Sequence, residues 1–171
     1  WANSPDCSVE VLTPDFLGVE EEALATVIAA EPEVFNHNIE TVRRLHRRMR
    51  GAKASYDGAL WLLARAKEVA RYPVLTKSGI IVGLGETNDE VVATMRDLRA
   101  HGVDVVTIGQ YLQPSKRHAP IDRWVHPDEF RWLREQGEAL GFCSVFAGPL
   151  VRSSYRADEQ KHAADTGRGA V

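Results

Sequence analysis

Short β-rich runs alternate with helix-period segments along almost the whole sequence, and this alternation limits the possible folds more than any other feature. Strands are predicted at 8–13, 34–36, 74–82, 103–108 and 142–147, and helices at 20–30, 41–50, 56–70, 87–98 and 128–140. The runs are apolar enough to be covered on both faces, which is typical of parallel strands joined by right-handed crossovers. The sequence therefore predicts an α/β fold, either a small open sheet or a segment of a barrel. The barrel segment is favoured because the chain opens almost directly on a strand.

Composition narrows the class of protein. The chain has 171 residues, of which 44% are hydrophobic and 26% charged, so it has room for one domain or for part of a larger one. The formal net charge of −3 gives no global positive field, and no apolar run approaches the roughly 18 residues of a membrane span. We therefore expect a cytoplasmic protein with neither a nucleic-acid nor a membrane partner.

The chain termini and the cysteines lead to further expectations. Residues 1–6 contain neither a signal peptide nor an initiating Met, which suggests that the chain begins inside a longer protein. The cysteines, Cys7 and Cys143, form neither a disulfide framework nor a metal-site spacing, so a reducing compartment is the simplest inference. Residues 1–157 are expected to form the folded part, and the Gly-containing, charged stretch 158–171 a disordered tail.

Polar residues gather where the predicted strands end, which is where parallel α/β proteins bind their ligands. The first group follows the strand at 34–36 and contains Asn36, His37, Asn38 and Glu40. A structural interpretation is equally open, with Asn38 capping the next helix, Glu40 in its first turn and His37 bonded to backbone.

The second group surrounds the strand at 74–82. It consists of Lys77, Ser78 and the turn with Gly83, Gly85 and Glu86. The glycines would let a ligand approach the backbone, and the amides that open the following helix suit an anionic group. Asn88 stands where a dinucleotide fingerprint needs its third glycine, so that motif fails. A purely structural turn explains the same residues.

Two further segments stand out. The loop from Gln110 to His126 is too long to be a mere connector and is a candidate binding segment. Residues 148–155 lie beyond the last strand and contain two serines without a nucleophile elbow, so a serine hydrolase is a poor hypothesis. Local sequence alone favours a surface turn there.

A basic stretch covers Arg43 to Lys53. Such a stretch is most often the solvated face of a helix. It could instead dock an acidic partner, and reversing the charge of Arg47 and Arg48 would then weaken that binding at low salt.

Six motifs, taken in order, resemble the lipoyl synthase family from about residue 8 to about residue 160. They are Thr13–Phe16, His37–Thr41, Thr76–Thr87, Gln110–Ser115, Trp124–Phe130 and Ala147–Tyr155. The Arg-Ser-Ser-Tyr at the end of the last motif is the most family-specific.

This resemblance implies a radical S-adenosylmethionine (SAM) enzyme, a sulfurtransferase built on a partial (β/α)6 TIM-like barrel, of which this chain is the carboxyl-terminal part. Members insert two sulfur atoms at C6 and C8 of an octanoyl group carried on a lysine of a lipoyl carrier protein. They use SAM and two [4Fe–4S] clusters, with thiolate ligands because such clusters need soft anions. A reductant such as ferredoxin or flavodoxin is a further implied partner.

The resemblance also suggests roles for individual residues. Ser154, with Ser153 as the alternative, would ligate the auxiliary cluster, and Arg152 would hold the substrate or cluster end of the site. The residues implied to border SAM are Asn38, Glu40, Lys77, Ser78, Gly83, Gly85, Glu86, Gln110 and Tyr111.

The chain also departs from the family. Both cysteine motifs are absent, and Gly58-Ala59 stand where the family usually carries Arg-Ser. The expectation is that the chain alone is inactive. Three alternatives stay open: a different radical SAM or methyltransferase-like protein, a non-catalytic α/β module that binds an acidic lipoyl carrier, and a small doubly wound nucleotide binder.

Overall fold

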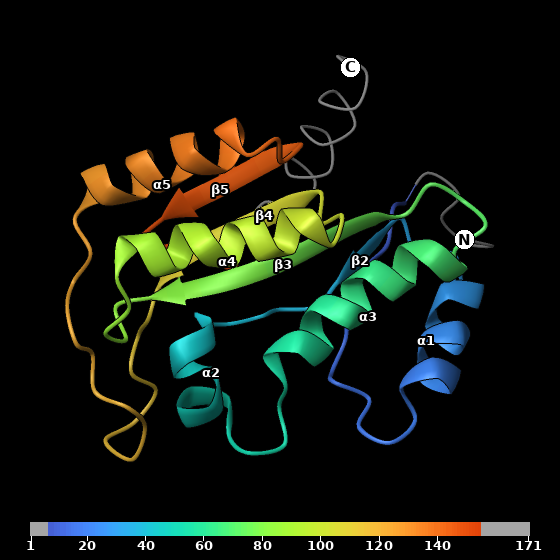
Figure 1. Ribbon diagram of the computed structural model, residues 1–171, viewed down its shortest axis with the longest axis horizontal. Coiled ribbons are helices and arrows are strands. Elements are labelled where there is room, and N and C mark those ends of the chain that lie inside the picture. The colour runs from blue at the N-terminus through green and yellow to red at the C-terminus, as the bar shows by residue number, and fades with distance from the viewer. Residues whose placement is uncertain (1–6, 155–171) are drawn as a thin grey trace.

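The computed structural model describes residues 7–154, which form five strands joined by five helices, two of them between the second and third strands (Figure 1). The elements are β1 (Glu10–Leu12), α1 (Glu20–Ala29), β2 (Val34–Asn36), α2 (Arg43–Arg50), α3 (Tyr56–Val69), β3 (Leu75–Val82), α4 (Asn88–Ala100), β4 (Val105–Gln110), α5 (Pro127–Ala139) and β5 (Ser144–Gly148). The predicted α/β fold is confirmed.

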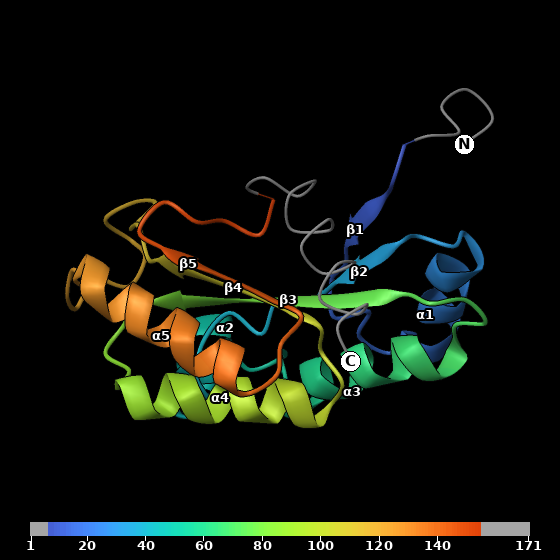
Figure 2. The same cartoon turned by 90° about the horizontal axis from the view of Figure 1, so that it is seen from above.

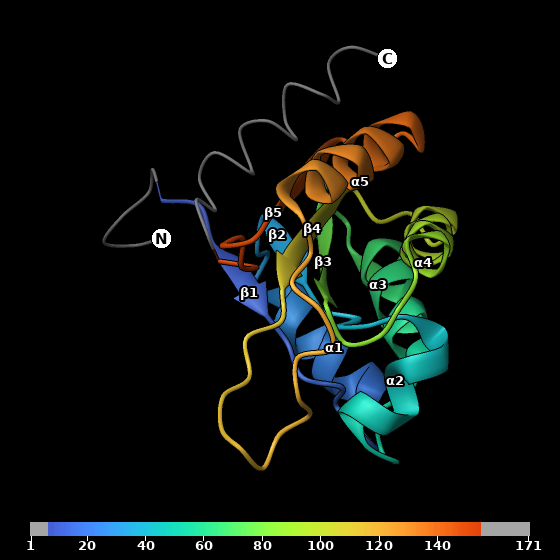
Figure 3. The ribbon, with the colours of Figure 1, turned by 90° about the vertical axis from the view of Figure 1, so that its left-hand side faces the viewer.

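The strand order separates the two architectures that the sequence left open. The order is β1-β2-β3-β4-β5, the same as along the chain, and every neighbouring pair is parallel. When successive crossovers all advance in one direction, right-handed connections place every helix on the same face. Figures 2 and 3 show the helices on one side of the sheet. A doubly wound sheet would reverse its order and carry helices on both faces, so this arrangement is that of part of a barrel.

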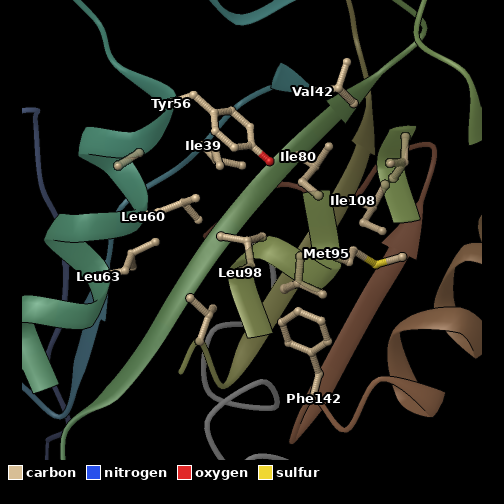
Figure 4. Packing of buried hydrophobic residues seen from close by; sticks show 14 of the residues in the cluster. Ile39, Val42, Tyr56, Leu60, Leu63, Ile80, Met95, Leu98, Ile108 and Phe142 are labelled. Atoms are coloured by element: carbon tan, nitrogen blue, oxygen red, sulfur yellow. The ribbon is translucent and has the colours of Figure 1, made fainter. Parts of the chain in front are cut away.

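The main hydrophobic core lies between the sheet and its helices (Figure 4). Ile80 and Ile108 of the sheet contribute to it, together with Leu63 of α3 and Met95 and Leu98 of α4. Each of these side chains is at most 2% exposed. The apolar positions of the helices are the positions that pack on the sheet, so the apolar periodicity of the sequence predicts the helices closely.

The opposite face of the sheet changes character along the strands. Near the amino ends, Val34, Leu75 and Val105 form a small apolar cluster with Phe146 packed against it. Side chains alternate between the two faces of a strand, so Lys77, Gly79 and Ile81 share this face with Leu75. Polar and small residues therefore replace the apolar ones toward the carboxyl ends. The candidate site lies at that end.

Most predicted boundaries are within two residues of the observed ones, and the differences have local causes. The helix predicted from Thr41 begins at Arg43, because the extended chain continues past β2 to a bridge between Glu40 and Ile80. The strand predicted from Val103 begins at Val105. Just before it, the Thr76 amide donates to the side-chain carboxylate of Asp104 at 2.8 Å and not to a backbone carbonyl oxygen of a neighbouring strand.

The last predicted strand starts two residues later and ends one residue later than expected. It was predicted at 142–147 and spans Ser144–Gly148, because Phe142 packs into the main core after the left-handed turn at Gly141 (φ +83°). The expected disordered tail at 158–171 lies outside the described residues.

Candidate active site

A cavity of about 500 Å³ lies on the helix-free face at the carboxyl ends of β3 and β4, and we call it the main cavity. Its walls come from the chain after β2, from β3 and β4, from the loop at 111–114, and from the Val151–Ser153 segment. Its polar lining residues are Asn38, Glu40, Thr107, Gln110, Tyr111, Gln113, Arg152 and Ser153. Three segments predicted separately from the sequence, near residues 38, 110 and 152, therefore meet at one site.

Two strand glycines make room for this arrangement. A Cβ on Gly79 would lie 2.8 Å from Asn38 Oδ1 and 3.1 Å from Thr107 Oγ1. A Cβ on Gly109 would lie 2.2 Å from the carbonyl oxygen of Val151. Gly79 lies within the second predicted group but was given no role of its own, and sequence reasoning missed Gly109. Glycine inside a strand pattern was the available signal, since it often marks the close approach of another backbone or a ligand.

Asn38 and Glu40 are two polar residues of the main cavity's lining. Asn38 Oδ1 is buried and has no hydrogen-bond partner among residues 7–154. Glu40 has a φ of +69°, an uncommon conformation for a residue with a side chain, and backbone hydrogen bonds with Gly79 and Ile81 hold it there. Burial raises the pKa of Glu40, and Arg50, whose Nη1 lies 3.6 Å from Glu40 Oε1, opposes that rise.

Lys77 and Ser78 lie within the wall and do not line the main cavity. The Lys77 ammonium donates to both oxygens of Glu10, at 2.8 and 2.9 Å, and to the Ser153 carbonyl oxygen. These contacts use all three of its donors. Ser78 Oγ accepts a hydrogen bond from the Ile39 amide at 3.1 Å. In this structure both residues support the segments that form the cavity.

The glycine turn after β3 also lies outside the main cavity. The Glu86 carboxylate accepts hydrogen bonds from the Gly83 amide at 2.6 Å and from the Leu84 amide at 2.9 Å. An internal carboxylate therefore occupies two amides of the glycine turn. At the start of α4, where an anionic ligand was expected, the Glu90 amide already donates to Thr87 Oγ1 in the capping box. Gly85 has a φ of +100°, which fits its place in a tight turn.

Gln110 and Tyr111 anchor the long loop beside the main cavity. Gln110 accepts from the Val125 amide at 2.9 Å and donates to the carbonyl oxygen of Arg123 at 3.2 Å. The Tyr111 hydroxyl donates to the Ala119 carbonyl oxygen at 2.9 Å. These bonds hold the far end of the loop against Gln110 of β4 and the middle of the loop against Tyr111, so the loop is anchored beside the cavity.

The two candidate serines differ in position. Ser153 and Arg152 line the main cavity, whereas Ser154 is exposed and does not line it. Arg152 Nη1 donates to the Val151 carbonyl oxygen at 2.6 Å. Tyr155 lies outside the described residues.

The residues present do not supply the ligands of an iron–sulfur cluster. Cys7 is exposed, Cys143 is partly buried and neither forms a disulfide. Among residues 7–154, no group of three His, Cys, Asp or Glu side chains could hold a metal ion. The polar groups of Asn38 and Glu40 do match the hydroxyls and amino-acid group of a cofactor such as SAM.

The basic stretch divides into paired and unpaired residues. Arg43 contacts Asp57 at 2.8 Å, Arg44 contacts Glu90 at 2.6 Å and Arg50 contacts Asp15 at 3.2 Å. Arg47 and Arg48 are exposed and make no ion pair within the described part of the chain. Arg43, Arg44 and Arg50 therefore have a structural role, because each forms an ion pair with another segment of the chain.

Comparison with known proteins identifies the family. A family model described as the radical SAM superfamily matches residues 2–98. The chain belongs to the radical SAM superfamily. The lipoyl synthase of Alcanivorax borkumensis is 53% identical over 166 residues, which cover 97% of this chain and 50% of that protein.

Two other relatives give the same result for this radical SAM chain. The lipoyl synthase of Rubrobacter xylanophilus is 54% identical over 98% of this chain and 50% of its own length, and that of Thermus thermophilus is 54% identical over 91% and 47%. The resemblance to lipoyl synthase predicted from six motifs is confirmed. The chain spans about half the length of the curated relatives it matches.

No helix within residues 7–154 is both long enough and apolar enough to cross a membrane.

Proposed function

We propose that this chain is the carboxyl-terminal half-barrel of a lipoyl synthase, the sulfurtransferase that inserts sulfur at C6 and C8 of a protein-bound octanoyl group. One observation carries the proposal. The Arg152–Ser153 part of the most family-specific motif lies against the carboxyl end of β4, where it closes a polar cavity on the helix-free face. The identity to lipoyl synthases, which extends over nearly the whole chain, supports it.

In this proposal the main cavity receives SAM, which supplies an organic radical when bound. Asn38 lines the cavity, so its side-chain amide can orient the amino or hydroxyl groups of the cofactor. Glu40 offers a carboxylate beside it, while Gln110 and Tyr111 keep the loop wall in place. The other residues predicted to border SAM do not line the main cavity. Lys77 and Ser78 support its wall through hydrogen bonds, and Gly83, Gly85 and Glu86 belong to the turn after β3.

The metal ligands belong to the same proposal. Ser154, with Ser153 as the alternative, would offer a hydroxyl oxygen to the auxiliary [4Fe–4S] cluster, and Arg152 would hold the substrate or cluster end of the cavity. The described residues do not provide the cysteines of either cluster, so a partner segment must bring them. A ferredoxin- or flavodoxin-type reductant, an octanoylated lipoyl carrier protein and a cytoplasmic location complete the proposal.

The proposal is tested on a gene product that joins this chain to the cysteine motifs. The protein is reconstituted anaerobically with iron and sulfide, and an octanoylated carrier is assayed for lipoyl formation by mass spectrometry. Loss of product in Ser154→Ala, with an altered iron content, supports the assignment of Ser154, and Ser153→Ala is the matched control. Full turnover in both variants would contradict the serine role. An iron-loaded protein that leaves octanoyl groups unchanged would contradict the function and favour a different radical SAM enzyme.

A second candidate function is a non-catalytic module that binds an acidic lipoyl carrier. The exposed cations Arg47 and Arg48, which have no ion-pair partner among the described residues, favour it. Calorimetric titration with a carrier protein in the absence of iron tests it. Affinity without any turnover would support this candidate, and no heat of binding would exclude it.

A further inference from the structure

A second cavity opens beside the main cavity. It measures about 200 Å³ and lies between the end of α2 and the loop after β4, and we call it the side cavity. The two cavities share four lining residues, Glu40, Ile81, Tyr111 and Pro114. Pro114 and His118, which also line the side cavity, are exposed. The side cavity therefore leads from the surface to the main cavity.

The lining of the side cavity is mainly apolar. Met49, Ile81, Leu84 and Ala119 contribute aliphatic or thioether surface. The Arg50 and Glu40 side chains also line it, but Arg50 Nη1 lies 3.6 Å from Glu40 Oε1 and Arg50 also contacts Asp15, so these charges are paired. An uncharged aliphatic chain is the kind of ligand that such a lining accepts.

The helix that forms one side of this cavity carries unpaired positive charge. Arg47 and Arg48 of α2 are exposed and lie in the same short helix as Met49 and Arg50. Neither contacts an acidic side chain in the part of the chain that the structure describes. An acidic protein surface that docks on α2 would neutralise them and would be brought close to the side cavity.

We propose that the side cavity is the passage through which an acyl chain on a lysine of an acidic carrier protein reaches the main cavity. Met49, Leu84 and Ala119 then contact the methylene groups of the chain and favour a long chain over a short one. The octanoyl identity of this chain rests on the proposed function. The aliphatic character and the acidic carrier follow from the lining of the side cavity and from the cations on α2.

Chain-length preference is the direct test. Short neutral peptides with an acetyl-, octanoyl- or decanoyl-lysine carry a fluorescent label, and their binding to the 171-residue chain is measured by anisotropy. We expect the octanoyl peptide to bind at least tenfold more tightly than the acetyl peptide, since each buried methylene is worth about fourfold in affinity. Ala119→Phe should remove most of this gain by filling the side cavity. Met49→Ala should weaken octanoyl binding by about fourfold or more, because it removes buried contacts with the chain.

A control variant and a charge reversal complete the design. Ala52→Phe adds the same ring at an exposed position just after α2 and should bind all three peptides as the parent chain does. Arg47→Glu with Arg48→Glu should weaken binding of an octanoylated acidic carrier at least tenfold at low salt, and should leave the neutral peptide unaffected.

Equal affinity for acetyl and octanoyl peptides would overturn the proposal, and so would an Ala119→Phe variant that keeps the octanoyl preference. Refutation of the passage can be told apart from failure of the proposed function. Lipoyl formation with an unchanged chain-length preference in both cavity variants would refute the passage and leave the enzyme assignment standing. Length-selective binding without lipoyl formation would support the passage and contradict the enzyme assignment.

Discussion

Replacing Lys77 by Met should destabilise the protein strongly, because it breaks a buried ion pair while keeping a side chain of similar length. Lys77 is 1% exposed, and its ammonium donates to Glu10 Oε1, Glu10 Oε2 and the Ser153 carbonyl oxygen. Burial lowers the pKa of Lys77, and the hydrogen bonds to Glu10 oppose that shift. The charge therefore depends on Glu10 for its stabilisation in the folded protein.

The structure sets the size of the effect. After the substitution, the Glu10 carboxylate keeps only the hydrogen bond from Asn36 Nδ2, at 2.8 Å, among those found in the structure. Removing one partner of a buried pair costs about 3–5 kcal/mol. Glu10 is 18% exposed, so water reaches it and the lower limit of about 3 kcal/mol is expected. That is a large part of the roughly 5–15 kcal/mol that holds an ordinary domain together.

Urea unfolding followed by circular dichroism at neutral pH measures this free energy. The double variant Lys77→Met with Glu10→Gln should recover about 1 kcal/mol or more relative to Lys77→Met, because no unpaired charge remains. Lys77→Met should also speed proteolytic cleavage near Ser153, since the ammonium holds that carbonyl oxygen. A loss of less than about 1 kcal/mol in the single variant would refute the reasoning, because it would mean that Glu10 needs no partner.

Three other predictions concern the strand glycines and the start of α4. Gly109→Ala places a Cβ 2.2 Å from the Val151 carbonyl oxygen, so it should cost about 1–3 kcal/mol in urea unfolding. Gly148→Ala, whose Cβ meets only the Val151 Cγ2 at 3.3 Å, is its control and should cost less. The Arg44 hydrogen bond lowers the pKa of Glu90 from 4.5 to about 2, so its stabilisation is complete above pH 4.5 and is lost as the pH falls toward 2. Glu90→Gln should flatten that part of the stability–pH profile, and an unchanged profile would contradict it. Thr87→Ala removes the hydroxyl of the capping box and should lower the unfolding free energy by about 1 kcal/mol, with a value near zero counting against the cap.

The sequence by itself determined the elements and their local start signals. Apolar periodicity predicted ten elements in the observed order, and Thr87 with Glu90 predicted the capping box that begins α4. These features depend on residues within a few positions of one another, so no knowledge of the rest of the chain is needed to infer them. The motif resemblance to lipoyl synthase is confirmed by the sequence comparisons.

Only the tertiary structure decided which polar residues face the main cavity. In a strand that is buried on both faces, the sequence shows no contrast between them. A glycine in the strand pattern signals a close approach at Gly79, but only the structure shows that Gly79 faces the cavity and that the Lys77 ammonium is held by Glu10. The same holds for Gly109, whose partner Val151 lies far along the chain. Pairing of β3, β4 and β5 in chain order brings these distant segments together on the helix-free face, and the packing of the whole sheet sets that arrangement.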